Sequence, residues 1–144
     1  VEVTIVILLL KPPIALPESL AAILIAFIFL LIGICLSFFL SFCVSMIAFW
    51  SNEIWAPRFI YFMMIFMLAG NYFPLDILPK NIYNILLYTP FPYFIFMPAH
   101  ILLKGYTSVT LWQSAIGMVW TGIFALLARF LWKRGMKEFS FYGK

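Results

Sequence analysis

The sequence has few charged residues. Only 10% of its 144 residues are Asp, Glu, Lys or Arg, whereas 66% are hydrophobic and 20% are aromatic. An ordinary soluble domain has about 25% charged and about 45–50% apolar residues, so this chain cannot supply the polar surface of a free-standing soluble protein. Intrinsic disorder is also excluded, because it requires low hydrophobicity and high net charge. The composition indicates a membrane protein.

Groups that carry out catalysis are scarce as well. The chain has one histidine, His100, and the acids Glu53, Asp76 and Glu138 fall on different segments. We find no metal-ligand spacing, no nucleophile motif and no phosphate-binding G-x-x-x-x-G-K-[ST] loop. We therefore expect no catalytic residue, no metal and no cofactor in this chain, and no ATP hydrolysis by it.

The cysteines and the aromatic residues point to no further chemistry. Cys35 and Cys43 lie eight residues apart in one apolar run, about 12 Å along a helix, which is too far for a disulfide between them. The aromatic residues stand inside apolar runs rather than between Lys and Arg, so we expect no nucleic-acid partner.

Long apolar runs are abundant instead. Residues 19–52 hold 34 positions without charge or proline, whereas about 20 suffice to cross a bilayer. This run predicts a membrane span that begins near Ser19. Its surplus length is expected to become tilt or an interfacial turn near Phe49 and Trp50.

A second span is predicted over residues 106–131, because residues 105–128 contain neither charge nor proline. It leads into a basic tail, residues 132–144. Positive charge accumulates in cytoplasmic loops, so the C-terminus is predicted to be cytoplasmic, in the cell (inner) membrane. The residues expected to anchor it are Arg129, Lys133, Arg134 and Lys137.

Residues 56–73 form a third predicted span. Only 17 uncharged residues separate Arg58 from Asp76. The segment can still cross if a helix starts around Pro57, since proline is tolerated in a first turn, and ends at aromatic residues of the opposite interface.

Residues 74–105 are equally apolar but rich in proline, which argues against a straight helix. We predict a re-entrant pair of short helices on the outer side, because broken backbone at membrane depth must be covered by protein or water. The alternative is one proline-kinked span from Ile82 to Leu103. The residues expected to shape the re-entrant turn are Gly70, Pro74, Leu75, Pro79, Pro90, Pro92 and Pro98. The aromatic residues expected to seal its outer end are Tyr72, Phe73, Phe91 and Tyr93.

The first ten residues, VEVTIVILLL, are apolar but too short to cross alone, and the chain begins with Val. We expect this single transmembrane domain, residues 1–144, to be a piece of a longer protein, with residues 1–10 ending an earlier span.

Small residues recur on the two long spans at helical spacing. Such stripes let another helix approach closely, so helix packing is the prediction, and lining of a substrate path by the serines is the alternative. The two stripes are Gly33, Ser37, Ser41 and Ser45, and Gly117, Thr121 and Ala125.

Placing an ionisable side chain at membrane depth costs free energy, so such a residue suggests a functional site. Asp76, His100 and Arg58 each sit beside a proline or a turn, so interfacial placement is the simpler interpretation. The alternative is a membrane-embedded enzyme acting on lipids, which would require Asp76 and His100 within hydrogen-bond reach.

Five segments, in order, carry a resemblance to the C-terminal half of ABC-2 family permeases of bacterial exporters. They are A-F-W at 48–50, G-N-Y-F-P-L-D-I-L-P at 70–79, Y-T-P-F-P-Y at 88–93, P-A-H-I-L-L-K-G at 98–105 and W-K-R-G-M-K-E-F-S-F-Y-G at 132–143.

The resemblance implies a six-span permease of which this chain supplies the fourth to sixth helices, with short re-entrant helices outside. Such permeases pair as homo- or heterodimers with a second permease subunit. They bind two cytoplasmic ABC ATPase subunits, whose closure on ATP moves substrate outward. The expected fold is therefore an all-α polytopic bundle of about three transmembrane helices plus a proline-rich re-entrant hairpin, in a subunit that forms part of a translocation path in the lipid bilayer and is not itself an enzyme. A structural or assembly subunit without transport activity is the remaining alternative.

Overall fold

The computed structural model describes residues 19–106 and 108–142, and within them the chain is helical and contains no strand. This confirms the all-α class. The segment predicted to end an earlier span, residues 1–10, lies outside the described residues. The elements are α2 (Leu20–Ser45), η1 (Met46–Phe49), α3 (Trp55–Leu68), η2 (Leu75–Ile77), α4 (Lys80–Leu87), η3 (Phe91–Tyr93), α5 (Phe96–Lys104) and α6 (Ser108–Tyr142), where η marks a short 3₁₀ turn.

Helix α2 begins where the sequence predicts. The Ser19 hydroxyl accepts a hydrogen bond from the Ala22 backbone N–H at 3.2 Å, which caps the first turn. The α-helix tightens into η1 at Met46, and the chain leaves the helical path at Trp50. The surplus of the 34-residue run thus becomes a 3₁₀ turn and a short connection.

Helix α3 starts at Trp55 with Pro57 in its first turn, where the missing N–H costs nothing. It ends at Leu68, because Gly70 adopts φ +85° and turns the chain away. Fourteen residues reach about 21 Å, which is less than the hydrocarbon core of about 30 Å. A full crossing by residues 56–73 stays a prediction.

Helix α6 is the longest element, with 35 residues. It continues without interruption through the basic segment, so most of residues 132–144 extend the helix rather than forming a separate tail. At about 1.5 Å per residue it is about 52 Å long.

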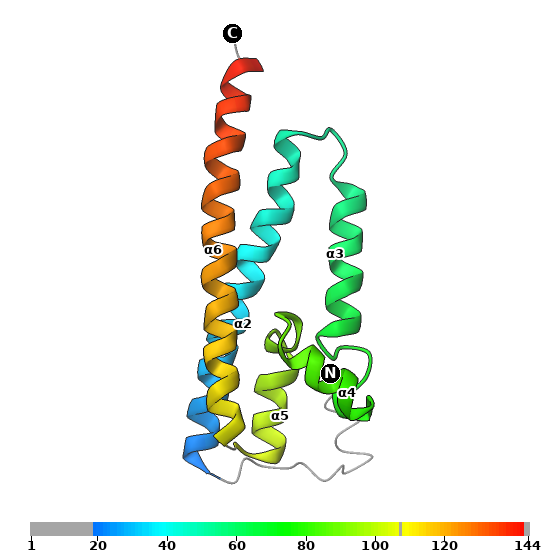
Figure 1. The fold of residues 1–144 in the computed structure, drawn as a ribbon, viewed down its shortest axis with the longest axis vertical. Helices are drawn as coiled ribbons and strands as arrows, with labels where there is room; N and C mark the ends of the chain where they lie inside the picture. The colour runs from blue at the N-terminus through cyan, green and yellow to red at the C-terminus, as the bar shows by residue number, and fades with distance from the viewer. Residues whose placement is uncertain (1–18, 107, 143–144) are drawn as a thin grey trace, which may run out of the picture.

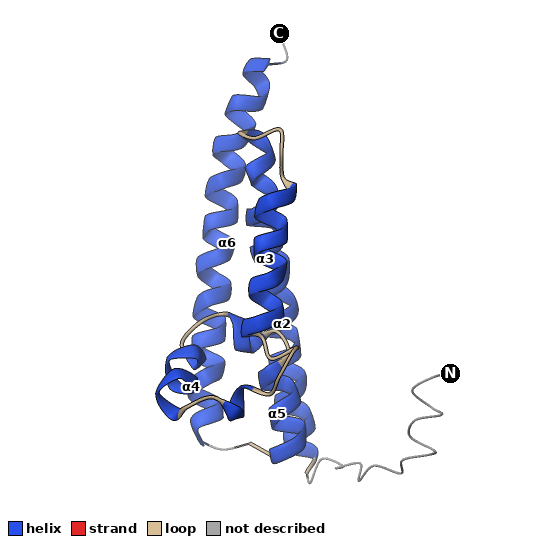
Figure 2. Cartoon of the chain, turned by 90° about the vertical axis from the view of Figure 1, so that its right-hand side faces the viewer, coloured by secondary structure: helices blue, strands red, loops and turns tan. Residues whose placement is uncertain are grey.

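The helices form an elongated bundle (Figure 1). Helices α2 and α6 run in the same direction and pack against each other, and α3 returns antiparallel to them. We call the end at which α2 and α6 begin the hairpin end, because the short helices α4 and α5 lie there, and the opposite end the tail end. Figure 2, turned by 90°, shows the same separation, with α4 and α5 gathered at the hairpin end.

The packed core lies in the hairpin half of the bundle. It joins one face of α2 to the segment from η2 to α5, and its members are Ala26, Phe29, Leu36, Leu75, Leu86, Leu87, Tyr93, Phe96, Met97 and Ile101.

Outside this core, the long helices expose large apolar side chains along most of their length. The stretches Leu20–Phe49 and Thr110–Glu138 are long and apolar enough to cross a membrane, with mean hydropathies of 3.1 and 1.7 in their most apolar 18 residues. Only 28% and 11% of those residues are buried, whereas a core helix of a soluble protein would be mostly buried. These exposed surfaces suit contact with lipid.

Candidate functional site

The proline-rich segment folds as a hairpin of short helices, and several predicted residues define its breaks. Gly70 has positive φ, and a Cβ there would lie 3.3 Å from Cβ of Phe96. Pro74, in extended conformation, precedes η2, and Pro79 precedes α4. Leu75 of η2 is only 1% exposed, and its burial anchors this turn to the core. These residues end α3 and start α4 in a new direction.

The remaining prolines form the inner turn of the hairpin. Pro90 precedes η3 and Pro92 lies inside it, so α4 cannot continue past Tyr88. Pro98 lies in the first turn of α5, a position that proline tolerates. Residues 82–103 are therefore divided between two short helices instead of forming one kinked helix.

The two ends of the hairpin meet through charged side chains. The Lys104 ammonium, at the end of α5, forms a hydrogen-bonded ion pair with the Asp76 carboxylate of η2. The His100 Nε2 atom lies 3.8 Å from the other oxygen of Asp76. All three side chains are partly exposed. Entry and exit of the hairpin are thus held together at one end of the bundle.

The inner turn of the hairpin inserts between the two long helices. Tyr93 is fully buried, and its hydroxyl donates a 2.7 Å hydrogen bond to the carbonyl of Leu87. A Cβ at Gly33 of α2 would lie 2.5 Å from the Tyr93 carbonyl oxygen, and a Cβ at Gly117 of α6 would lie 3.1 Å from the Tyr93 ring. Two glycines therefore make room for the turn. Gly33 lies about 20 Å along α2 from its start, which places Tyr93 well inside the bundle, away from the hairpin end.

One more hydrogen bond ties the hairpin to α6. The Trp120 indole N–H donates to the Tyr88 carbonyl at 2.8 Å. Tyr72 and Phe73 were also expected to seal the outer end. Tyr72 is largely exposed after α3 and Phe73 is about one-third exposed, whereas Phe91 packs beside Phe94 with ring centres 6.3 Å apart.

The serines of the α2 stripe face α3 rather than α6. Ser41 Oγ lies 2.8 Å from the Tyr61 hydroxyl of α3, in a hydrogen bond whose donor either group can be. Ser45 Oγ accepts a 3.4 Å hydrogen bond from Arg58 of α3 and donates to the Ser41 carbonyl.

A crevice of about 480 Å³ lies beside these contacts. We call it the α2–α3 crevice, and its lining residues are Gly33, Ile34, Ser37, Phe38, Ser41, Ile65, Phe94 and Ile95. The inner turn of the hairpin contributes the last two, so the hairpin closes one side of this mainly apolar space.

The small residues of α6 face in two directions. Gly117 faces Ile32 of α2 and Tyr93 of the hairpin. The Thr121 hydroxyl instead donates to the Gly117 carbonyl and thus stays within its own helix. Thr121 also borders a shallow pocket next to Cys35. Ala125 is half-buried.

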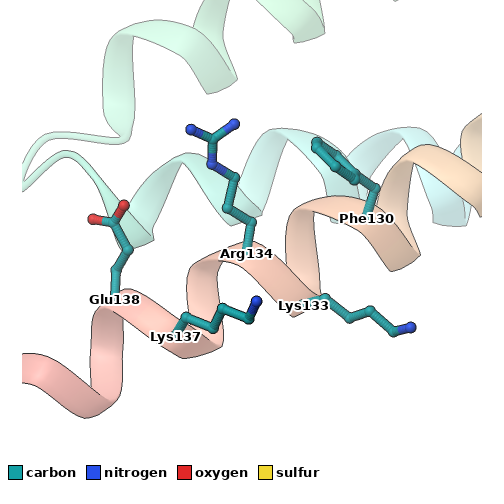
Figure 3. Close-up of a pocket in the computed structure, with 5 residues that line it drawn as sticks. All are labelled: Phe130, Lys133, Arg134, Lys137 and Glu138. Carbon is teal, nitrogen blue, oxygen red and sulfur yellow. The ribbon is translucent and has the colours of Figure 1, made fainter.

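The basic residues predicted as an anchor lie on the last turns of α6 at the tail end. Arg129 is exposed, and Lys133, Arg134 and Lys137 line a groove of about 580 Å³ with Phe130 and Glu138. In Figure 3, Phe130, Arg134 and Glu138 point to one side of α6, and the two lysines point away from that side.

The geometry gives little support to catalysis by Asp76 and His100. Their 3.8 Å separation is beyond hydrogen-bond distance, and the Asp76 carboxylate is already engaged by Lys104. In the part of the chain that the structure describes, no three His, Cys, Asp or Glu side chains gather closely enough to hold a metal ion.

The contacts that three residues make were not predicted from the sequence. Tyr61 bonds to Ser41, Trp120 bonds to the hairpin, and Lys104 pairs with Asp76. The opposite charges of Lys104 and Asp76, each near one end of the proline-rich segment, were the one available signal.

Comparison with known proteins gives one match. A family profile described as ABC-2 family transporter protein matches residues 3–143, nearly the whole chain. No curated protein and no solved structure matches significantly.

Proposed function

The chain belongs to the ABC-2 family of transporter proteins, and we propose that it forms part of the translocation path of an ATP-driven exporter, as half of a permease. At the family level it is an ABC transporter permease of the membrane, and its apolar helices suit this assignment. The substrate path, the orientation, the partners and the roles of single residues are our proposals.

The hairpin is the observation that carries the proposal. Its ends are joined by the Asp76–Lys104 pair, and its inner turn lies between Gly33 and Gly117. A segment that enters and leaves at the same end of a bundle does not cross it. We assign it as re-entrant from the outer side, with Gly70 and the prolines as the residues that shape its turns. The crossings are then α2, α3 and α6.

Charge supports the orientation. Arg129, Lys133, Arg134 and Lys137 lie at the tail end of α6, where Lys and Arg favour the cytoplasmic side. We therefore propose a multi-pass protein of the cytoplasmic membrane, with the tail end inside and the hairpin end outside.

The α2–α3 crevice is the candidate section of the path within this chain. Its walls combine apolar side chains with the hydroxyls of Ser37 and Ser41, and the hairpin borders it at Phe94. A second permease subunit would complete the path, and cytoplasmic ABC ATPase subunits would hydrolyse ATP, because this chain has no phosphate-binding loop.

Cysteine labelling tests the topology. In a background with Cys35→Ala and Cys43→Ala, we expect Lys80→Cys and Tyr106→Cys to react with an impermeant maleimide in intact cells. Lys137→Cys should react only after permeabilisation. The measurement is the labelled fraction of purified protein.

Each alternative topology has its own labelling pattern. A kinked span over residues 82–103 would place positions 80 and 106 on opposite sides, so labelling of only one of them from outside contradicts the hairpin. Labelling of position 137 from outside contradicts the orientation. Asp76→Cys is a poorer probe of the same end, because it removes the partner of Lys104.

Reconstitution tests the transport assignment. The complete permease that contains this chain should co-purify with an ABC ATPase, and reconstitution of both in liposomes should raise the ATPase rate several-fold over the ATPase alone. The control is an ATPase with a substituted P-loop lysine, which should bind the permease and hydrolyse nothing. Absence of both co-purification and stimulation would favour a structural subunit without transport.

A further inference from the structure

A second pocket lies between the hairpin and α6, apart from the α2–α3 crevice. It has a volume of about 280 Å³, just below the range of about 300–1,000 Å³ typical of drug-sized ligands. Its lining residues are Asn84, Leu87 and Tyr88 on the hairpin side and Trp112, Gln113 and Ile116 on α6. We call it the amide pocket, after Asn84 and Gln113.

Gln113 is the unusual residue of this pocket. It is only 7% exposed, yet its side chain has no hydrogen-bond partner among the residues that the structure describes. Its amide is not sealed off, because no buried side-chain nitrogen or oxygen among those residues lacks a partner. The amide thus retains accessible surface, and Gln113 is one of the residues that line the pocket. A glutamine that lines a pocket and engages no partner in the described part of the chain offers a ligand both a hydrogen-bond donor and an acceptor.

The other walls define the chemistry of that ligand. Asn84 adds a second amide, and each amide both donates and accepts hydrogen bonds. Tyr88 and Trp112 are 62% and 64% exposed and present aromatic surface at the rim. Among the residues that the structure describes, no charged side chain lines the pocket, so none of them would neutralise an anion or a cation there.

We propose that the amide pocket binds one neutral polyhydroxylated ring, such as a single pyranose unit. Its hydroxyls would form hydrogen bonds with the amides of Gln113 and Asn84, each of which can both donate and accept. Its C–H face would lie on aromatic surface, which offers a large apolar contact at low entropic cost. The pocket size fits one ring rather than a longer chain.

A quaternary ammonium group is the closest competing ligand, because tyrosine and tryptophan faces also attract cations. Such a ligand would not use the Gln113 amide. The dependence of binding on Gln113 therefore separates the two chemistries. The proposal rests neither on transport nor on the orientation in the membrane, since binding is measured without ATP and with both sides accessible.

The test uses the full permease that contains this chain, in lipid nanodiscs, because many detergents carry sugar headgroups. Methyl glucoside and, separately, choline are titrated by calorimetry. We expect saturable binding of methyl glucoside to the wild type, and weakening by at least about tenfold in Gln113→Leu, since the leucine leaves ligand hydroxyls unpaired. Methyl glucoside should also raise the melting temperature of the wild type but not of the variant.

Two further variants keep the result interpretable. Gln113→Leu without ligand should melt no lower than the wild type, because the Gln113 amide has no hydrogen bond to the described residues to lose. Asn84→Leu, at an exposed position of α4, should weaken binding independently. Trp132→Phe, on α6 at the tail end, is the control and should bind like the wild type. Equal binding by Gln113→Leu, binding of choline alone, or no binding of methyl glucoside would each overturn the proposal.

Discussion

Gly33→Ala should displace the inner turn of the hairpin and destabilise the bundle by about 3 kcal/mol, the upper end of the usual overpacking cost. The added Cβ would lie 2.5 Å from the Tyr93 carbonyl oxygen and close to the Phe94 backbone. These are backbone atoms, so no side-chain rotation relieves the clash, and the buried Tyr93 leaves the turn little freedom to move. The expected readouts are a lower melting temperature in nanodiscs and loss of permease-stimulated ATPase activity.

Gly122→Ala is the matched control for this prediction. A Cβ at Gly122 of α6 meets nothing within 4 Å, and alanine is the better helix former by about 1 kcal/mol. The control should therefore be neutral or slightly stabilising. If Gly33→Ala behaves like Gly122→Ala, the hairpin does not pack against α2 at this point.

Tyr93→Ala should cost about 3–5 kcal/mol, the range for removing a large aromatic side chain from a core. Tyr93 is fully buried, stacks near Phe29 with ring centres 6.2 Å apart, and contacts Gly117 of α6. Its removal leaves a cavity where three elements meet. The measurement is again thermal unfolding in nanodiscs, where the variant should melt far below the wild type.

Tyr93→Phe separates the ring from its hydroxyl. Only the 2.7 Å hydrogen bond to the Leu87 carbonyl is lost, so a cost of about 1–3 kcal/mol is expected for the buried acceptor left behind. A matched exposed substitution is Tyr72→Phe, which should change little. A Tyr93→Ala effect no larger than that of Tyr93→Phe would show that the ring is not packed as described.

The long helices were predictable from the sequence because they depend on local properties. The 34-residue uncharged run marks a long apolar helix by composition alone. The cap at Ser19 and the proline in the first turn of α3 act on neighbouring residues, and α2 and α3 begin at these positions. The end of α3 was harder to place. The predicted span continued to residue 73, whereas the helix ends at Leu68, where the positive φ of Gly70 turns the chain.

The tertiary partners could not be derived from periodicity. The spacing of Gly33, Ser37 and Ser41 marks one helix face, but small residues can face a helix, a turn or a cavity with the same pattern. In the fold Gly33 meets backbone of the hairpin, and Ser41 meets Tyr61. Gln113 gave no signal either, because a single glutamine in an apolar run acquires meaning only when α4 packs next to it.

The unbroken length of α6 has a mechanical consequence. Gly117 contacts Tyr93 of the hairpin, and Gly135 packs against the ring of Phe49 in η1, which follows α2 at the tail end. The two glycines are about 27 Å apart along one helix. If α6 tilts as a rigid lever with Gly117 as its fulcrum, a rotation of about 10° carries Gly135 through about 5 Å. Because α6 is unbroken between the two glycines, a force at its basic end would reach the contact with Tyr93 as a torque about Gly117, and the bending stiffness of α6 sets how much of that torque is transmitted.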